Sequence, residues 1–230
     1  MILQDFSSIC IVIPYYNALT YLNNAVNSII ETTNNSINIL IVDNNSDKPF
    51  SVKGRKIEVI RNVNNLGFTK AINQGIKLYR NCDIIPFNSD SIALPNWIEN
   101  LYIAAYSRNK VALVCPRHII GNGVKKNTAI NNLTSPQPFY DKNGYRLMRW
   151  AGFTCVYIKR SALEDVGLLD EKYWHFSSDE EWCNRARMKN WSIIYCNTAS
   201  VKHIGGVSYN ILKKRSPKIV QNKIDKGLRL

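Results

Sequence analysis

Short apolar runs alternate with segments in which apolar residues recur at helical spacing. Leu19–Ile30 and Phe68–Tyr79 carry apolar residues every three to four positions and therefore predict helices. Four runs rich in β-branched residues predict strands: Ile9–Ile13, Ile37–Val42, Lys56–Ile60 and Cys82–Phe87. Apolar strands separated by amphipathic helices are typical of a parallel sheet that is covered on both faces. Residues 1–90 therefore predict a Rossmann-like, doubly wound α/β half.

The second half of the chain has a less regular pattern. Helices are predicted over Pro95–Tyr106 and Asp179–Lys189, and strands over Val111–Pro116, Phe153–Ile158 and Ile193–Cys196. Gly121–Gly144 is rich in Asn, Gly, Lys and Pro, which predicts a long loop able to close over a ligand. No internal repeat is visible. We expect one α/β domain over residues 1–210, with halves at 1–90 and 91–210, followed by a basic tail at 211–230.

The charge of the chain favours anionic partners. The formal net charge is +13 and the pI is about 9.5, so nucleic acid, an acidic membrane face and phosphorylated small molecules all deserve consideration. Asp225 is the only acid in the basic tail. The tail is therefore either a solvated helix or frayed end, or a peripheral contact with anionic lipid headgroups.

Cysteine usage and hydropathy bear on the compartment. The six cysteines form no Cys-x-x-Cys pair, and several lie within apolar runs, so we expect buried free thiols in a reducing compartment. No apolar stretch reaches the roughly 18 residues of a membrane-spanning helix. Met1–Ser8 lacks the features of a signal peptide. These features predict a location in the cytoplasm or at the cytosolic face of a membrane.

Polar clusters follow three of the predicted strands: Pro14–Asn17, Asp43–Asp47 and Asn88–Ser91. Ligands of doubly wound sheets bind beyond the carboxyl ends of the strands. Asp43 can accept hydrogen bonds from a nucleobase or ribose, and Tyr15 offers an aromatic face for a base. Proline and asparagine are also common turn formers, but three such loops at one sheet edge favour a ligand site.

The start of the second predicted helix suits a phosphate. Asn65-Leu66-Gly67-Phe68 opens this helix, and free backbone N–H groups at a helix N-terminus bind anions. The chain has no Gly-x-Gly-x-x-Gly, no Gly-x-x-x-x-Gly-Lys-[Ser/Thr] and no Gly-x-Ser-x-Gly motif. Dinucleotide-dependent dehydrogenases, P-loop enzymes and α/β hydrolases are therefore disfavoured.

Two carboxylates and one histidine are candidates for chemistry. Asp90 can hold Mg²⁺ or Mn²⁺ with phosphates completing the shell, or it can simply start a turn. His203, beside Gly205-Gly206, can complete a metal site, although a lone histidine is more often structural. Ser178-x-x-Glu181 predicts a capping box, and Asp179 within it is a candidate general base. The last two interpretations are compatible.

The ordered set of motifs resembles the inverting family 2 glycosyltransferases of GT-A fold, in particular a rhamnosyltransferase-like branch. The resemblance covers Ile9 to Ser208 and is carried by Val12–Asn17, Ile41–Asp47, Asn65–Phe68, Asn73–Gly75, Asn88–Asp90, Trp150–Gly152, Gly167–Glu171, Ser178–Ala186 and His203–Gly206. Two positions depart from the family pattern. Asn88 replaces the first Asp of the metal motif, and Ser178 replaces the Glu that usually precedes the catalytic Asp.

The resemblance implies transfer of a sugar from a UDP- or dTDP-linked donor to a hydroxyl acceptor, with inversion and with help from Mn²⁺ or Mg²⁺. The acceptor would belong to a glycan, a lipid-linked molecule or a protein. Asp179 would be the base, and Asp90 and His203 would hold the metal. Residues 1–90 would bind the nucleotide through Pro14, Tyr15, Asn17, Asp43, Asn45, Asn65, Gly67, Asn73 and Ser89. Residues 91–210 would bind the acceptor, with Trp150, Gly152 and Trp174 near the sugars.

Three alternatives remain. A nucleotidyltransferase normally carries an early Gly-rich loop with a basic residue, and Pro14–Asn17 has neither. A catalytically degenerate sugar-nucleotide-binding module would explain the departures at Asn88 and Ser178. A nucleic-acid-binding protein rests on net charge alone and predicts a steeply salt-dependent affinity; with no recognisable motif, we expect no nucleic-acid partner.

Overall fold

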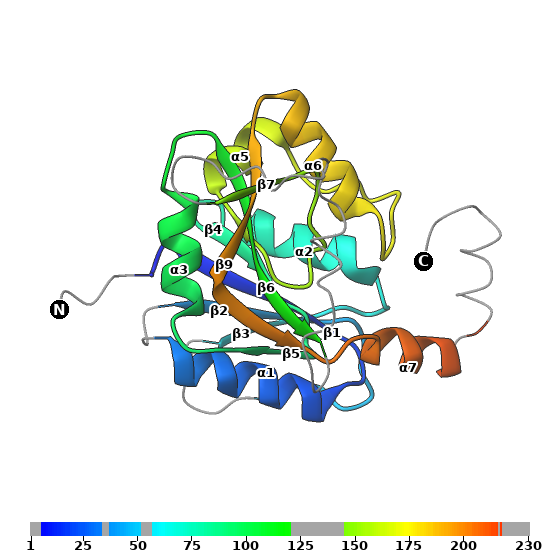
Figure 1. The fold of residues 1–230 in the computed structure, drawn as a ribbon. Helices are drawn as coiled ribbons and strands as arrows, with labels where there is room; N and C mark the ends of the chain where they lie inside the picture. Colours follow the sequence, from blue (N-terminus) through cyan, green and yellow to red (C-terminus); the bar gives the residue numbers. More distant parts are fainter. Residues whose placement is uncertain (1–5, 34–36, 52–56, 121–144, 216, 218–230) are drawn as a thin grey trace.

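The computed structural model describes residues 6–33, 37–51, 57–120, 145–215 and 217 (Figure 1). The long loop predicted over Gly121–Gly144 lies outside the described residues. The strands are β1 (Ile9–Tyr15), β2 (Asn38–Asp43), β3 (Ile57–Arg61), β4 (Asp83–Pro86), β5 (Ser91–Ala93), β6 (Val111–Ile120), β7 (Arg146–Met148), β8 (Tyr157–Ile158) and β9 (Ser192–His203). The helices are α1 (Leu19–Thr32), α2 (Gly67–Leu78), α3 (Trp97–Ala105), α5 (Arg160–Val166), α6 (Ser178–Met188) and α7 (Val207–Arg215).

The described strands form one mixed sheet in the order β3-β2-β1-β4-β8-β6-β9-β5, and β7 pairs with β9 off this path. The first four strands of that order are mutually parallel. Their connections run through α1 and α2, which confirms the Rossmann-like first half. The register aligns Tyr15 of β1 with Asp43 of β2, so the loops that follow both strands leave the sheet at the same edge.

The second half of the sheet changes strand direction. β8 runs antiparallel to both β4 and β6, whereas β6 and β9 are parallel. β5 is antiparallel to β9, and its register places Ser91 opposite His203. Strand pairing therefore brings the residue before Ser91, which is Asp90, next to the last residue of β9.

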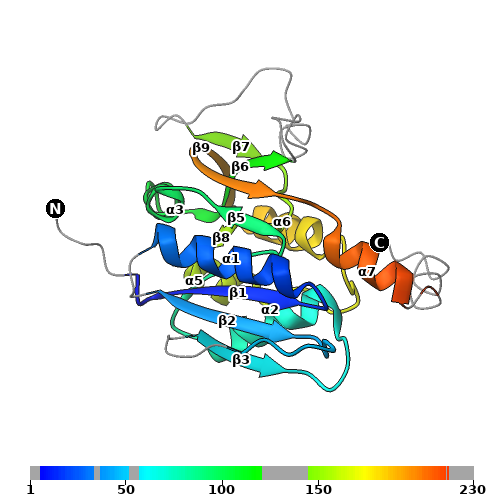
Figure 2. The same ribbon diagram turned by 90° about the horizontal axis from the view of Figure 1, so that it is seen from below.

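Helices cover both faces of the sheet (Figures 1 and 2). α1 and α3 pack on one face, together with Ile9, Ile11 and Ile13 of β1. α2, α5 and α6 pack on the other face, together with Cys10 and Val12 of the same strand. Successive side chains of a strand point to opposite faces, so a continuous apolar run such as Ile9–Ile13 is what a sheet buried on both sides requires.

Several element boundaries differ from the sequence prediction. β8 is shorter than the predicted strand Phe153–Ile158, and its earlier part contributes only an isolated bridge between Phe87 and Cys155. β9 runs on through a polar stretch to His203, helped by a register shift opposite Pro116 and Arg117. Among the described elements, β5, β7 and α5 were not predicted, and α7 begins before the basic tail, for which a helix was one of the alternatives.

The predicted capping box at the start of α6 is wrong. The residue before the helix, Ser177, has a left-handed φ of 73° and makes no side-chain cap. The hydroxyl of Ser178 instead lies 3.0 Å from the hydroxyl of Thr69 in α2, where both side chains are buried. Glu181 pairs with Arg185 one turn later. Ser178 therefore ties α6 to α2 rather than capping its own helix.

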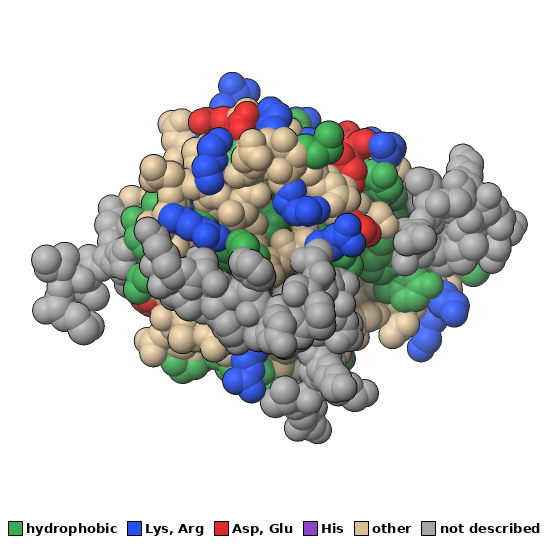
Figure 3. Space-filling model, turned by 45° about the horizontal axis from the view of Figure 1, so that its top comes forward, with side chains coloured by type: hydrophobic (Ala, Val, Ile, Leu, Met, Phe, Trp, Pro, Cys, Tyr) green, Lys and Arg blue, Asp and Glu red, His purple; other side chains and the backbone are tan. Residues whose placement is uncertain are grey.

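The cysteine and charge expectations can be compared with the structure. All six cysteines are free and buried, which confirms the prediction of buried thiols. No described helix is both long and apolar enough to cross a membrane. On the face shown in Figure 3, the Lys and Arg side chains are dispersed, and the visible Asp and Glu side chains lie beside some of them.

Candidate active site

A cavity of about 180 Å³ opens at the carboxyl edge of the parallel strands. Its walls come from the loops after β1, β2 and β4, the start of α2, the segment before α6, and the start of α7. The lining residues are Pro14, Tyr15, Tyr16, Asn44, Asn65, Gly67, Phe68, Asn88, Ser89, Asp90, Thr154, Trp174, His175, Phe176, His203, Gly206, Val207, Ser208, Tyr209 and Leu212. The predicted strand-end loops therefore meet at one cavity.

The loops after β1 and β2 are hydrogen-bonded to each other. The backbone N–H of Asn17 donates to the Ser46 hydroxyl at 2.9 Å, and the N–H of Asp47 donates to the Asn17 side-chain oxygen at 2.8 Å. Asn17 and Asn45 both have left-handed backbones, with φ of 54° and 65°. Asparagine tolerates this region better than most residues. Both asparagines thus shape the loops, and neither lines the cavity.

Asp43 is fully buried and its carboxylate is occupied by the protein. One oxygen accepts a hydrogen bond from the Ser46 N–H at 2.8 Å, and the other forms an ion pair with Arg61. Arg61 also donates to the Ser46 carbonyl at 2.8 Å. Asp43 is absent from the cavity wall. Its carboxylate therefore holds the β2 loop in shape beneath the cavity.

The start of α2 is fitted closely to the opposite wall. The buried side chain of Asn44 donates to the Gly67 carbonyl at 3.2 Å, and Asn65 accepts from the Gly67 N–H at 3.0 Å. Gly67 has a φ of +84°, and a Cβ there would lie 2.7 Å from the Trp174 indole ring. Only glycine satisfies both the backbone conformation and the close approach. Gly67 thereby lets Trp174 stand against the helix start.

Asp90 and His203 form a polar pair in the cavity wall. The His203 Nε2 atom lies 3.2 Å from an Asp90 carboxylate oxygen and 3.5 Å from the Asn88 amide nitrogen. The Val207 N–H donates to the other Asp90 oxygen at 3.3 Å. Burial opposes ionisation of Asp90, but the hydrogen bond and charge of His203, together with backbone N–H donors including Val207, outweigh it and lower the pKa of the carboxyl. Burial also lowers the pKa of nearby His118 to about 4, which keeps that imidazole neutral.

The pair fits a divalent cation bound jointly with a substrate. Among the described residues, no group of three or more His, Cys, Asp or Glu side chains is arranged to hold a metal ion. Asp90 and His203 nevertheless offer a carboxylate oxygen and an imidazole nitrogen 3.2 Å apart. Carboxylates suit Mn²⁺ and Mg²⁺, and a neutral imidazole is a common metal ligand. An ionised Asp90 is ready to bind a cation. The remaining positions would be left for the oxygens of a bound diphosphate.

Asp179 lies at the first turn of α6, outside the cavity wall. Its carboxylate accepts a hydrogen bond from the Glu180 N–H at 2.9 Å, and a Cβ on Gly152 would lie 3.6 Å from its other oxygen. Burial raises the pKa of Asp179, and backbone N–H donors, including that of Phe153, offset this only in part. A carboxylate with a raised pKa is a better proton acceptor.

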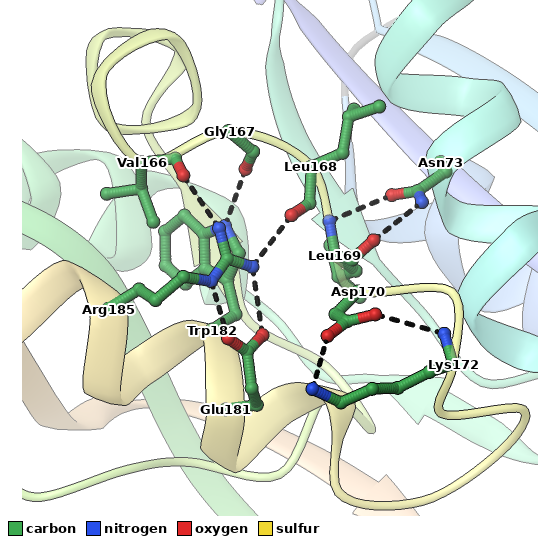
Figure 4. Close-up of polar contacts among 10 residues, drawn as sticks. All are labelled: Asn73, Val166, Gly167, Leu168, Leu169, Asp170, Lys172, Glu181, Trp182 and Arg185. Atoms are coloured by element: carbon green, nitrogen blue, oxygen red, sulfur yellow. Dashed lines mark hydrogen bonds and ion pairs between the residues drawn. The ribbon is translucent and has the colours of Figure 1, made fainter.

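Arg185 of α6 fixes the segment that leads towards the cavity (Figure 4). Its guanidinium forms a two-point ion pair with Glu181, at 2.6 and 2.9 Å. It also donates to the carbonyls of Val166 and Leu168, each at 2.7 Å. The Trp182 indole N–H donates to the Gly167 carbonyl at 2.8 Å. The turn after α5 is thus attached to the helix that carries Asp179.

Asn73 closes the same segment from the side of α2. Its amide donates to the Leu169 carbonyl at 2.9 Å, and its side-chain oxygen accepts from the Leu169 N–H at 3.0 Å (Figure 4). The amide also donates to Glu171 at 3.0 Å. Asn73 is buried and does not line the cavity. Its role in the structure is to hold the 169–171 segment.

The structure divides the predicted site residues into two groups. Those that line the cavity are Pro14, Tyr15, Asn65, Gly67, Ser89, Asp90, Trp174 and His203. Those that do not line it are Asn17, Asp43, Asn45, Asn73, Trp150, Gly152 and Asp179. Trp150 is half-buried and packs against the core cluster that also contains Trp182, Cys183 and Ala186 of α6.

The cavity residues of α7 were not predicted from the sequence, and neither were the neighbouring aromatic rings of His175 and Phe176. The Gly205-Gly206 turn, with φ of +86° and +74°, was a usable signal that a new element starts there. The apolar residues Val207 and Leu212 that follow this turn both line the cavity.

Comparison with known proteins identifies related sequences. Residues 10–167 match the description "Glycosyl transferase family 2". An uncharacterized glycosyltransferase of Haemophilus influenzae is 27% identical over 106 residues, which cover 43% of this chain and 33% of that protein. Glycosyltransferase GlyG of Streptococcus pneumoniae is 32% identical over 101 residues, which cover 41% of this chain and 34% of GlyG. The chain thus spans about a third of the length of these curated relatives.

Two solved structures share the fold. The crystal structure of GalNAc-T7 with UDP, GalNAc and Mn²⁺ aligns with a TM-score of 0.69 at 16% identity, covering 86% of this chain and 43% of that one. Residues 1–349 of S. aureus TarS align with a TM-score of 0.64 at 14% identity, covering 90% of this chain and 63% of that one. The fold is therefore the expected GT-A-like α/β fold. With the family profile matching well over half of its length, the chain belongs to glycosyl transferase family 2.

Proposed function

We propose that this protein is a glycosyltransferase that moves a sugar from a UDP- or dTDP-linked donor to a hydroxyl acceptor, with inversion and with help from a divalent metal. The acceptor would be a glycan, a lipid-linked molecule or a protein. The observation that carries the proposal is the Asp90–His203 pair in the wall of a cavity built from the strand-end loops. The GalNAc-T7 structure of the same fold contains UDP and Mn²⁺.

The charges of the cavity wall support metal dependence. Asp90 is the only residue of fixed charge among the described lining residues, which include neither lysine nor arginine. A nucleoside diphosphate brings at least two negative charges into this space. Because burying unpaired charge is strongly unfavourable, a bound cation would offset the charge of the diphosphate against this wall. Asp90 and His203 are the side chains placed to hold it, and the metal would stabilise negative charge on the departing diphosphate.

The reaction is a single displacement. The acceptor oxygen forms a bond to the anomeric carbon, and the bond from that carbon to the donor diphosphate breaks, with its electron pair leaving on the diphosphate. The proton of the acceptor hydroxyl passes to Asp179, whose burial raises its pKa and increases its basicity. Attack opposite the leaving group inverts the anomeric configuration.

The lining residues support separate parts of the donor. Tyr15 and Tyr16 lie at the end of β1, where the family resemblance expects the base. The N-terminus of α2 presents backbone N–H groups beside Asn65 and Gly67 and suits a phosphate. Asn88 occupies the first position of the metal motif. Because the resemblance is to a rhamnosyltransferase-like branch, dTDP-rhamnose is one donor to test.

The deciding experiment is thermal unfolding with UDP, dTDP, GDP and ADP, each with and without Mn²⁺. A ligand at about 100 times its dissociation constant adds roughly 2.7 kcal/mol, which raises Tm by about 5–10 °C for a chain of this size. We expect such a shift with UDP or dTDP only when Mn²⁺ is present. The shift should be lost in Asp90→Asn and in His203→Ala.

Two other outcomes would change the assignment. A metal-independent shift that survives both substitutions would contradict the metal site. Binding with no release of diphosphate from UDP- or dTDP-sugars would favour the degenerate sugar-nucleotide-binding module. Two observations favour this second candidate. Asn88 replaces an Asp of the metal motif, and the described residues include no cluster of three metal ligands.

A further inference from the structure

Five aromatic rings from three separate parts of the chain form one wall of the cavity. They are Phe68 of α2, Trp174, His175 and Phe176 of the segment before α6, and Tyr209 of α7. We call these five residues the aromatic wall. Ring centroids lie 6.3 Å apart for Phe68 and His175, 4.5 Å for His175 and Phe176, and 6.2 Å for Phe176 and Tyr209. The rings thus form a continuous series.

The aromatic wall is partly accessible rather than part of the core. Phe176 is 39% exposed, and Trp174, His175 and Tyr209 are half-buried. Large apolar side chains that remain exposed in the wall of a cavity are typical of a ligand site. Residues 174–176 and 209 also lie beyond residues 10–167, where the family match ends. The family resemblance suggested only Trp174 among these residues as lying near a sugar, and it gave no role to His175, Phe176 or Tyr209.

The position of the aromatic wall relates it to the acceptor. Phe176 precedes Asp179 by three residues, and α6 begins between them at Ser178. A general base must lie within about 3 Å of the proton that it removes. With Asp179 as the base, the acceptor hydroxyl must reach the start of α6, and residues 174–176 are the part of the cavity wall that directly precedes this helix in the chain.

The chemistry of the aromatic wall favours a ring-shaped, partly apolar ligand. A pyranose ring presents C–H groups on its flat faces, which pack on aromatic rings with dispersion and loss of apolar surface to water. Its hydroxyls at the ring edge keep polar partners. A serine side chain or an acyclic alcohol has no such face.

We propose that the aromatic wall is the acceptor subsite and binds the C–H face of a pyranose, so that the acceptor is a carbohydrate. This inference rests on the proposed glycosyltransferase function and deepens it.

The test compares acceptors by the release of UDP or dTDP from the donor above the rate of donor hydrolysis. The panel contains the methyl pyranosides of glucose, galactose, N-acetylglucosamine and rhamnose. Glycerol, mannitol and N-acetylserine methyl ester serve as acceptors without a pyranose ring. We expect at least one pyranoside to raise the rate tenfold or more, and the acyclic compounds to have no effect.

Variants link this acceleration to the rings. Phe176→Ala and Tyr209→Ala should each raise the acceptor KM about tenfold and lower the ratio of transfer to hydrolysis, whereas Phe176→Tyr, which keeps a ring, should stay within threefold. Ile103→Ala removes an exposed apolar side chain of α3 outside the cavity and is the matched control. Phe176 is exposed enough that its substitution should not prevent folding.

Several results would overturn the inference. These are equal acceleration by the serine ester or by mannitol, no acceleration by any pyranoside while the donor is hydrolysed, and unchanged acceptor KM in both alanine variants. Weaker UDP or dTDP binding in the alanine variants, with the acceptor KM unchanged, would assign the rings to the nucleobase. Absence of donor turnover altogether would instead reject the proposed function, and the hydrolysis arm without acceptor detects that separately.

Discussion

Asp179 combines two features that pull its protonation in opposite directions. Burial raises its pKa, while backbone N–H groups at the first turn of α6 favour the ionised form. The net effect is a raised pKa, so this carboxyl holds a proton more strongly than a solvent-exposed aspartate does. This balance suits a base that must first accept a proton and later lose it.

The first prediction concerns the pH dependence of transfer. As the proposed base, Asp179 would act only when ionised, so kcat/KM should fall as the pH drops through its raised pKa, with the acid limb above the ordinary value of 3.8. Asp179→Asn should lower the rate by roughly 10²–10⁴-fold and remove this limb. The measurement is a pH profile of donor turnover for both proteins.

Glu180→Gln is the matched control for that profile. The charge of Glu180 contributes to the raised pKa of Asp179, so its removal should move the acid limb to lower pH while turnover at neutral pH persists. An acid limb that stays in place in Asp179→Asn would show that another group acts as the base.

At the scale of single residues, the sequence shows which polar residues follow each strand but not which partners they bind. Asp43 and Asp90 both follow apolar strands, yet Arg61 and Ser46 occupy the first and His203 faces the second. Asn73 lies in a motif that suggested nucleotide contact, and its amide is used by Leu169. A single motif cannot tell which polar group a distant element will occupy, because a partner such as His203 lies 113 positions from Asp90.

Among the elements, α6 is positioned by the side chains in Figure 4 rather than by a cap at its own N-terminus. Arg185 joins Glu181 on one side to the carbonyls that end α5 on the other. The ion pair is only partly exposed, with side-chain exposure of 31% and 21%. A two-point guanidinium–carboxylate pair that also binds two carbonyls uses geometry that lysine cannot reproduce.

The second prediction is that Arg185→Lys destabilises the fold. Loss of these hydrogen bonds should cost about 2 kcal/mol, and Tm should fall by roughly 4–8 °C. Arg187→Lys is the control, because Arg187 is exposed on the same helix. Thermal unfolding of the three proteins tests the prediction. Equal Tm values for the Arg185 and Arg187 variants would mean that the hydrogen bonds of the Arg185 guanidinium contribute nothing to stability.

The sequence predicted the long, strongly periodic elements and missed the short ones. β1, β2, α1 and α2 each bury an apolar face large enough to leave a pattern. β5 and β7 have three residues each and form only because β9 offers an edge to pair with. Their existence depends on tertiary pairing, which local periodicity does not contain.

At the scale of the whole molecule, the site depends on parts of the chain that the family match does not reach. The match ends at residue 167, but the segment before α6, the end of β9 and α7 all line the cavity. The two halves meet there: β1, β2 and β4 bring the loops of the parallel half, and β9 brings His203. Motif order predicted this meeting, whereas the contribution of α7 emerged only from the three-dimensional structure.

α7 follows β9 and forms part of the cavity wall. Gly205 and Gly206 turn the chain out of β9, and the Val207 N–H then binds Asp90. Leu212 is almost fully buried against the cavity, and Arg215 pairs with Asp47 of the β2 loop. That last ion pair is exposed and contributes little energy by itself. Together, these contacts join one end of α7 to the Asp90–His203 pair and the other end to the loops of the parallel half (Figure 1).

The final prediction is that α7 is part of the donor site. A chain ending at Gly206 lacks the N–H bound to Asp90 and the part of the cavity wall formed by Val207 and Leu212. Its affinity for UDP or dTDP with Mn²⁺ should fall at least tenfold, a loss of about 1.4 kcal/mol. A chain ending at Arg215 keeps every described lining residue and should bind as the full chain does. Titration of both chains by calorimetry separates the cases: equal affinities would place α7 outside the donor site, whereas selective loss at Gly206 would make this helix a functional part of the domain.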